Sequence, residues 1–68
     1  MDWININEKM PDERCLLQTT SKMIVIGDWY KGVWRVDGAI YWENKQLKSN
    51  YNKEDITHWM PLPIVWGG

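Results

Sequence analysis

The stretch that decides the fold is "KMIVIGDWYKGVWRV", residues 22–36. Residues 22–30 are rich in β-branched and aromatic side chains, which favour strands. Because apolar side chains fall on both faces of this strand, we expect it to lie inside a sheet and not at an edge. Lys31-Gly32 follows as a tight turn, since glycine readily adopts positive φ, and residues 33–36 return as a second strand. The stretch therefore predicts a β-hairpin.

Strand signals continue on both sides of this hairpin. Upstream, "RCLLQTT" at residues 14–20 is strand material and joins the hairpin through a short turn at Thr20-Ser21-Lys22. Downstream, Asp37-Gly38 is a second turn signal that leads into "AIYWE" at residues 39–43. The stretch "ITHWMPLP", residues 56–63, is a final strand ended by its prolines. The chain is therefore predicted to be mainly β, or small α+β, with an antiparallel meander sheet of roughly three to five strands.

Two segments lack this alternation. Pro11 suits the first position of a helix, so the sequence permits a short helical turn near it. Residues 43–55 are polar, rich in Asn and Lys and without apolar periodicity, which predicts a mobile loop. The length of 68 residues predicts a single small domain that spans residues 1–68.

The composition limits how such a small core is held together. Cys15 is the only cysteine and His58 the only histidine, so an intrachain disulfide and a Cys/His zinc site are both excluded. We accordingly expect no metal and no cofactor. Six tryptophans and three tyrosines stand in place of phenylalanine, and each such ring buries about 150–250 Å². Aromatic side chains in the core, together with assembly into a homo-oligomer, are the expected sources of stability.

Charge and hydropathy exclude two classes of partner. The net charge of −1, from 8 Lys and Arg against 9 Asp and Glu, gives little attraction to a long polyanion, so duplex DNA is not expected. No apolar run approaches the roughly 20 residues that span a bilayer, so no membrane association is expected. The first residues, "MDWININ", lack the charged and apolar regions of a signal peptide, and the expected compartment is cytoplasmic.

Few residues are candidates for catalysis. His58 would be a general base, oriented by Glu54 or Asp55, but Asp55 and His58 are three residues apart and would face opposite sides of a strand. No nucleophile stands at a suitable spacing, and Cys15 is expected to act as a small buried apolar residue. We therefore expect no catalytic residues and a protein that is not an enzyme. The alternative role of His58 is a structural hydrogen bond from its ring.

A binding surface is the stronger interpretation. Aromatic faces stack on nucleobases, and Lys or Arg side chains pair with phosphate. The same residue types are also hot spots of protein interfaces, so a small ligand and a protein partner both stay open. The candidate ligand-binding or interface residues are Trp29, Tyr30, Trp34, Arg35, Tyr41, Trp42, Lys45 and Lys48.

Three stretches, "DWININEKMPDE", "CLLQTTSKMIVIGDWYKGVW" and "ITHWMPLP", resemble the DUF551 family, small proteins of unknown function found mainly in bacteriophages and prophages. The likeness runs from end to end, with a loose match over residues 37–55 and a tail, "IVWGG", that departs from a Pro-rich end. Methionine also stands where leucine is more usual at position 10. The matching positions are Trp3, Ile4, Met10, Pro11, Thr57, His58, Trp59, Met60, Pro61, Leu62 and Pro63.

The resemblance implies an accessory protein of a phage or prophage that acts in the cytosol of an infected bacterium. It supplies no activity by itself. Small phage proteins often counteract a host function, either by binding a protein or by sequestering a signal molecule. The first hypothesis is binding of a small anionic, nucleotide-like ligand. The alternative is a protein inhibitor that occludes a host enzyme through an aromatic surface.

The shared pattern at the two ends of the chain indicates a closing motif. We expect Trp59 and Met60 to pack against the Trp-Ile pair at residues 3–4, and His58 to bond backbone near Pro11. The structural residues of this motif are Trp3, Pro11, His58, Trp59, Met60 and Pro61.

Overall fold

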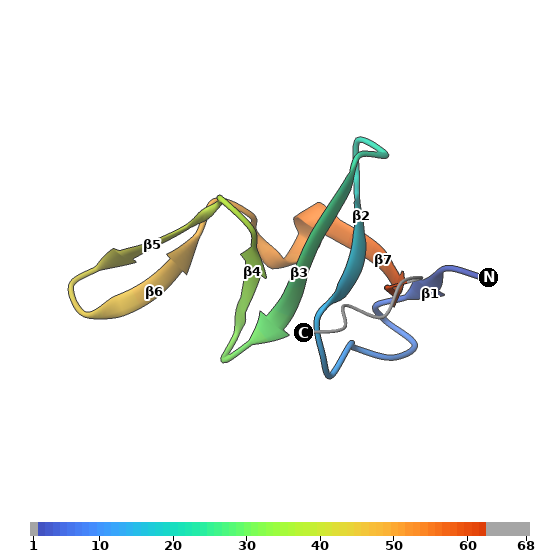
Figure 1. The fold of residues 1–68 in the computed structure, drawn as a ribbon, viewed down its shortest axis with the longest axis horizontal. Helices are drawn as coiled ribbons and strands as arrows, with labels where there is room; N and C mark the ends of the chain where they lie inside the picture. The colour runs from blue at the N-terminus through green and yellow to red at the C-terminus, as the bar shows by residue number, and fades with distance from the viewer. Residues whose placement is uncertain (1, 63–68) are drawn as a thin grey trace.

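The computed structural model describes residues 2–62, so Pro63 and the tail at residues 64–68 lie outside the described part of the chain. Within that part the chain forms seven strands and one 3-10 turn, η1 (Figure 1). The prediction of a mainly β fold with an antiparallel sheet is confirmed. The elements are β1 (Ile4–Asn5), β2 (Cys15–Thr19), β3 (Ile24–Tyr30), β4 (Val33–Val36), β5 (Ile40–Glu43), β6 (Gln46–Ser49), η1 (Lys53–Asp55) and β7 (Ile56–Pro61).

Strands β2, β3 and β4 form two consecutive antiparallel hairpins at the predicted positions. In the first turn the Thr19 N–H donates to the Met23 carbonyl at 2.9 Å, and Lys22 adopts a φ of 71°. In the second turn Lys31 and Gly32 have φ values of 46° and 84°. Positive φ at both central residues gives a turn whose twist matches that of the flanking strands, so this short loop fixes the register of β3 against β4.

The main sheet has five strands in the order β1-β7-β2-β3-β4, with β3 paired on both sides as expected for an interior strand. The last strand does not extend the meander at its end. Instead β7 enters between β1 and β2, antiparallel to both, with Trp59 opposite Ile4 on one side and Leu17 on the other. The two ends of the chain therefore close the sheet by direct pairing.

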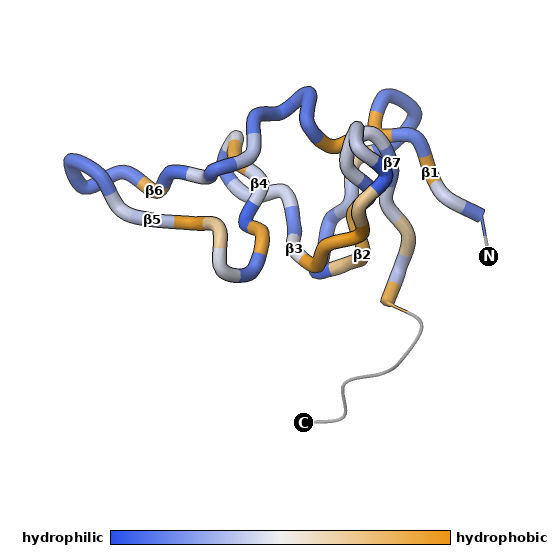
Figure 2. The backbone as a smooth tube through the Cα atoms, turned by 90° about the horizontal axis from the view of Figure 1, so that it is seen from above, coloured by the Kyte–Doolittle hydropathy of each residue, from blue (hydrophilic) through white to orange (hydrophobic). Residues whose placement is uncertain are grey.

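Strands β5 and β6 form a separate two-stranded sheet, which we call the ribbon. The chain leaves the main sheet at Gly38, whose φ is 78°, and the Ala39 N–H donates back to the Val36 carbonyl at 2.9 Å. This turn directs β5 away from the edge of β4, so the meander ends at β4. The ribbon lies beside the main sheet in both views, and it is largely hydrophilic in Figure 2. It covers neither face of the main sheet.

The prediction of a loop without regular structure over residues 43–55 is wrong, because this segment contains β6 and η1. Asn44 and Lys45 have φ values of 51° and 64°, so they make a second two-residue turn. The polar side chains in this segment suggested a loop, but they form hydrogen bonds with the backbone. The Asp55 carboxylate, for example, accepts from the Asn52 N–H at 2.7 Å. The short helical turn expected near Pro11 does not form, because residues 12–14 are bends, and the short helical segment of the described chain is η1. Mobility of the segment stays a prediction.

The core lies on one face of the main sheet. Alternation and register place Leu17 of β2, Trp34 of β4 and Trp59 of β7 on this face. The opposite face carries half-buried side chains such as Ile26 and Met60. Apolar side chains from outside the sheet, Met10 among them, pack on the core face, so a single sheet still has a closed core. The buried apolar residues are Cys15, Leu17, Trp34, Val36, Ile56 and Trp59.

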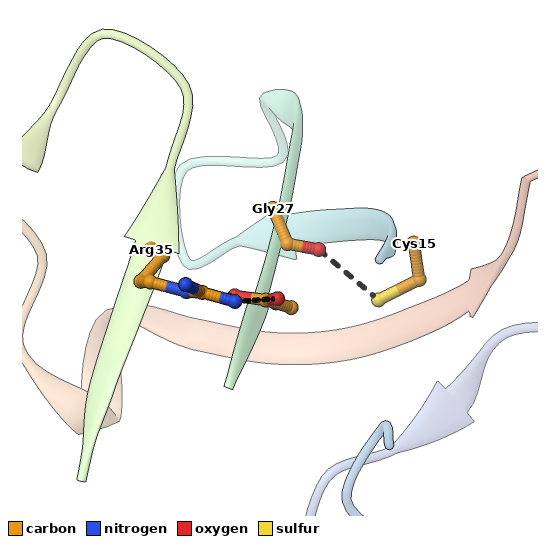
Figure 3. A network of polar contacts seen from close by, with 4 residues as sticks. Cys15, Gly27 and Arg35 are labelled. Atoms are coloured by element: carbon orange, nitrogen blue, oxygen red, sulfur yellow. Dashed lines mark hydrogen bonds and ion pairs between the residues drawn. The ribbon is translucent and has the colours of Figure 1, made fainter. Parts of the chain in front are cut away.

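The Cys15 thiol is part of this core, as expected from the sequence. Its exposed fraction is 0%, and its Sγ lies 3.6 Å from the Gly27 carbonyl on the neighbouring strand (Figure 3). Burial, with a smaller contribution from the nearby charges of Asp28 and Glu13, raises the pKa of the thiol to about 12. The thiol therefore stays protonated at neutral pH, where only a thiolate would act as a nucleophile.

We expect native protein to resist alkylation of Cys15 near pH 8, and unfolded protein to react fully. Mass spectrometry after a short pulse of iodoacetamide, with and without denaturant, measures this difference.

The raised pKa of Cys15 means that the folded state favours the protonated thiol. The stability that this preference contributes is complete below the unfolded pKa of about 9 and is lost as the pH rises towards 12. Rapid labelling of folded protein would contradict the burial of this side chain.

Candidate binding groove

A hollow of about 470 Å³ lies between the turn that joins β3 to β4 and the ribbon, and we call it the groove. The two turns that flank it are the positive-φ turns at Lys31-Gly32 and Asn44-Lys45. Strand β6 lies next to β4, which brings the two hairpins together. A hollow of this size falls within the range of small-ligand sites. The groove is lined by Tyr30, Lys31, Val33, Trp42, Lys45, Gln46, Leu47 and Lys48.

The charge of the groove is of one sign. Lys31, Lys45 and Lys48 line it, and no carboxylate does. Among residues 2–62 the ion pairs are Arg14–Asp37 and Arg35–Asp28, so none of the three lysines is neutralised by a described carboxylate. Three unpaired ammonium groups around one hollow favour an anion with more than one charged oxygen.

One aromatic ring at the groove is free to stack. Trp42 on β5 is 73% exposed, the largest exposed fraction among the large apolar side chains of the described chain. Tyr30 is different, because the Arg35 guanidinium lies 4.0 Å from its ring centroid and the Lys31 ammonium 5.2 Å away. These cations occupy the ring by cation–π contact. Trp42 is therefore the available stacking surface, whereas the Tyr30 ring is already in contact with two cations.

Arg35 does not point its charge at the groove. It faces Asp28 across the β3–β4 ladder and donates to that carboxylate from Nε at 2.8 Å and from a terminal nitrogen at 2.5 Å, as the close-up in Figure 3 shows for Arg35. The hydrogen bond with Asp28 raises the pKa of Arg35. Arg35 lines another hollow, of about 290 Å³, in which Arg14 and Asp37 form a second ion pair. The charges there balance, so this hollow does not select an anion.

The structure brings together half of the residues predicted for binding. Tyr30, Trp42, Lys45 and Lys48 line the groove. The other four predicted residues are placed elsewhere, Arg35 as described above and the rest as follows. Trp34 is 0% exposed, and Trp29 packs against it with ring centroids 4.8 Å apart. Tyr41 is exposed but does not line the groove.

The prediction that Trp34 contacts a ligand is therefore wrong, and the reason is its place in the strand. It shares a face with Val36, which points into the core, and its indole N–H donates to the Lys53 carbonyl at 3.1 Å. Sequence reasoning missed four lining residues: Lys31, which it placed only in a turn, and Val33, Gln46 and Leu47. Asn44 at a two-residue turn was the signal for the last two, because asparagine tolerates positive φ and marks a hairpin.

The closing motif is held by Trp59 and not by His58. The Trp59 indole N–H donates to the Lys9 carbonyl at 2.7 Å, close to the buried Pro11, and Ile4 pairs with Trp59 across the ladder. The expected bond from His58 to this backbone is therefore wrong. Met60, the next residue, alternates to the opposite face of the sheet and so does not share the packing of Trp59.

The remaining motif residues differ in burial. Trp3 is half-buried, and Pro61 is exposed and lies opposite Cys15 in the ladder between β2 and β7. Pro61 is the last residue of β7, as predicted. The half-buried Trp3 is not among the side chains that pack on the core, whereas Ile4 is. The prediction for the Trp-Ile pair is thus confirmed for Ile4.

His58 lines a different hollow, of about 370 Å³, beside the N-terminal turn. Its Nδ1 lies 2.9 Å from the Thr57 hydroxyl, which donates to the Gln18 carbonyl at 3.3 Å. The ring of His58 is thus held by its neighbour in the sequence and not by the N-terminal backbone. Lys53 and Glu54 line the same hollow with opposite charges. This hollow therefore lacks the single-sign charge of the groove.

Among residues 2–62, no three His, Cys, Asp or Glu side chains gather in a way that could hold a metal ion. None of the described helical segments has the length and apolar character needed to cross a membrane.

The chain was compared with known proteins. No curated protein and no solved structure matches it. The model of the family described as "Protein of unknown function (DUF551)" matches residues 2–64, which is nearly the whole chain and includes every strand of both sheets. On this match, the chain belongs to the DUF551 family.

Proposed function

We propose that this chain is an accessory protein of a bacteriophage or prophage that binds a small anionic, nucleotide-like ligand in the groove. The observation that supports it is the set of three unpaired lysines beside one free indole ring, around a hollow with no carboxylate. The whole chain has a net charge of −1, so this local excess of positive charge does not follow from the composition. Its compartment would be the cytosol of the infected bacterium.

The proposed action is sequestration and not conversion of the ligand. No carboxylate, imidazole or thiol lines the groove, so its titratable groups are three lysines and Tyr30. His58 lines the other hollow. A protein that removes a nucleotide signal or cofactor from solution would counteract a host function without turnover. Assembly into a homo-oligomer is part of this proposal.

The alternative is an inhibitor that covers a host enzyme, and the ribbon is the observation in its favour. All four residues of β5 are exposed, including Ile40, Tyr41 and Trp42. An exposed strand with one aliphatic side chain and two large aromatic rings is typical of a protein interface. Tyr41 separates the two functions, because it would contact a protein partner on the ribbon but lies outside the groove.

Isothermal titration with AMP, ATP, NAD and cyclic di-AMP tests the proposal. We expect at least one of them to bind, and Trp42→Ala to weaken that binding about 10-fold or more, because stacking contributes about 1–3 kcal/mol per base. Tyr41→Ala is the matched control, since Tyr41 is an exposed ring on the same strand, and we expect a change of less than about 2-fold. Thermal melts of both variants check that the fold is retained.

Native mass spectrometry of protein purified gently from a bacterial host gives an independent result. An oligomer that carries an extra mass of a few hundred daltons supports the proposal and begins to identify the ligand. A host polypeptide bound to the chain, lost in Tyr41→Ala, would instead establish the inhibitor. Absence of binding by every nucleotide tested, with no adduct in the spectrum, would overturn ligand binding in the groove.

A further inference from the structure

We infer that the ligand of the groove is a nucleoside polyphosphate, with a single base on Trp42 and a chain of phosphates shared by the three lysines. This inference rests on the proposed function and names its ligand class. It follows from two features that are independent of each other, the number of free stacking surfaces and the number and placement of free cations.

The groove offers one stacking surface. Trp34 is buried, and Trp29 is half-buried against it with the Lys53 ammonium 5.9 Å from the Trp29 ring. Tyr30 is occupied by the Arg35 guanidinium. Only Trp42 therefore presents an open face among the described aromatic residues that line the groove. A ligand with two bases would leave one of them without a partner.

The groove offers three cations, and they come from both sides. Lys31 stands on the turn between β3 and β4, while Lys45 and Lys48 belong to the turn and second strand of the ribbon. An anion that satisfies all three must reach from one hairpin to the other. A single phosphate has one compact centre of charge, whereas a triphosphate is an extended chain of charged oxygens. The cation placement thus favours a polyphosphate over a monophosphate.

The ribbon places the base and the phosphates at adjacent positions. Trp42 is opposite Leu47 in the β5–β6 ladder, and Lys48 is the next residue along β6. Leu47 and Trp42 share one face of the ribbon and form an apolar seat for a base. Lys48 lies opposite Tyr41 and alternates to the other face, but it still lines the groove. A base on Trp42 with its phosphates directed towards Lys48 and the turn lysines uses both features with one molecule.

The test compares adenosine, AMP, ATP, inorganic tripolyphosphate and cyclic di-AMP by isothermal titration against the full chain. GTP is added to show whether the base matters. We expect ATP or GTP to bind about 10-fold or more tighter than AMP and than tripolyphosphate. We also expect the affinity for ATP to fall as salt is raised to physiological strength, where the Debye length is about 8 Å, with a smaller fall for AMP.

The lysine variants are chosen to preserve the backbone. Lys31→Asn and Lys45→Asn suit the positive φ of the two turns, and Lys48→Gln suits a strand. Each exposed charge pair contributes about 3- to 5-fold in affinity, so the triple variant should weaken ATP binding about 30- to 120-fold and adenosine binding hardly at all. Lys9→Gln is the control, because Lys9 is exposed and lies outside the groove.

Each other outcome has a definite meaning. AMP that binds as tightly as ATP, or cyclic di-AMP that binds more tightly, overturns the polyphosphate inference and leaves the proposed nucleotide site standing. Tripolyphosphate as tight as ATP overturns the role of Trp42 as a base platform. Absence of binding by all of these compounds overturns the proposed function itself. If the logarithm of the ATP affinity falls in the triple variant by no more than three times its fall in Lys9→Gln, the loss follows net charge alone, which would overturn the assignment of the three lysines.

Discussion

Gly27→Ala is expected to leave the protein largely unfolded. A Cβ at this position would lie 2.2 Å from the Arg35 carbonyl oxygen and 2.9 Å from the Val36 Cα, both of them backbone atoms of β4. Strand β3 is paired with β2 on its other side, so it cannot move away from β4 without breaking a ladder. We expect a cost of about 3 kcal/mol or more, against a total stability of about 3–5 kcal/mol for a domain of this size.

Urea titration followed by circular dichroism measures this effect, and Gly38→Ala is the matched control. Gly38 has a φ of 78° and no atom within 4 Å of the added Cβ. An alanine there is destabilised only by the strain of positive φ, which costs about 1–2 kcal/mol. Gly27 lies within β3, so its cost comes from the clash. Two variants of equal stability, or a Gly27→Ala protein within about 1 kcal/mol of the parent, would refute the close approach of β3 and β4.

Trp34→Ala is expected to cost about 3–5 kcal/mol, the usual range for truncation of a buried tryptophan. The side chain is 0% exposed and packs edge-on against Trp29. Its indole N–H also ties β4 to η1 through the Lys53 carbonyl. Trp34→Phe keeps most of the apolar surface and removes this donor, so a smaller cost of about 1–2 kcal/mol is expected. The free energy of unfolding in urea gives both values.

Trp42→Ala serves as the control for this series, because it removes the same side chain from an exposed position. We expect its stability to change by no more than about 0.5 kcal/mol. If Trp34→Ala and Trp42→Ala have the same midpoint, Trp34 is not the centre of the core. The same pair separates stability from binding, since Trp42→Ala is expected to lose ligand and Trp34→Ala to lose the fold.

The β2–β3–β4 part of the sheet was predictable because its signals are local. The alternation of residues 22–30 and the Gly32 turn depend on neighbours in the chain, and sequence pattern records such preferences directly. The place of β7 between β1 and β2 was not predictable in this way. Pairing between Ile4 and Trp59 joins residues at opposite ends of the chain, and no local preference specifies which edge of a sheet such a strand joins.

The candidate site divides along the same line. Tyr30, Trp42, Lys45 and Lys48 were found because exposed rings and lysines near turns are a compositional signal. Trp34 and Arg35 are of the same residue types, aromatic and basic, but were misassigned because their roles depend on cross-strand neighbours. Trp34 points to the core, and the charge of Arg35 is neutralised by Asp28. A residue type shows what a side chain can do, and the register of the strands decides whether it is free to do it.

By itself, the sequence determined a mainly β chain with hairpin turns, a buried thiol and its membership of the DUF551 family, because turn residues, alternation and the terminal motifs are read position by position. Only the tertiary structure decided that the ribbon leaves the sheet at Gly38, that Trp59 and not His58 anchors the N-terminal segment, and which lysines share a groove. These features depend on contacts between segments that are distant in the chain. Such contacts contribute to the free energy of folding only once the sheet has closed.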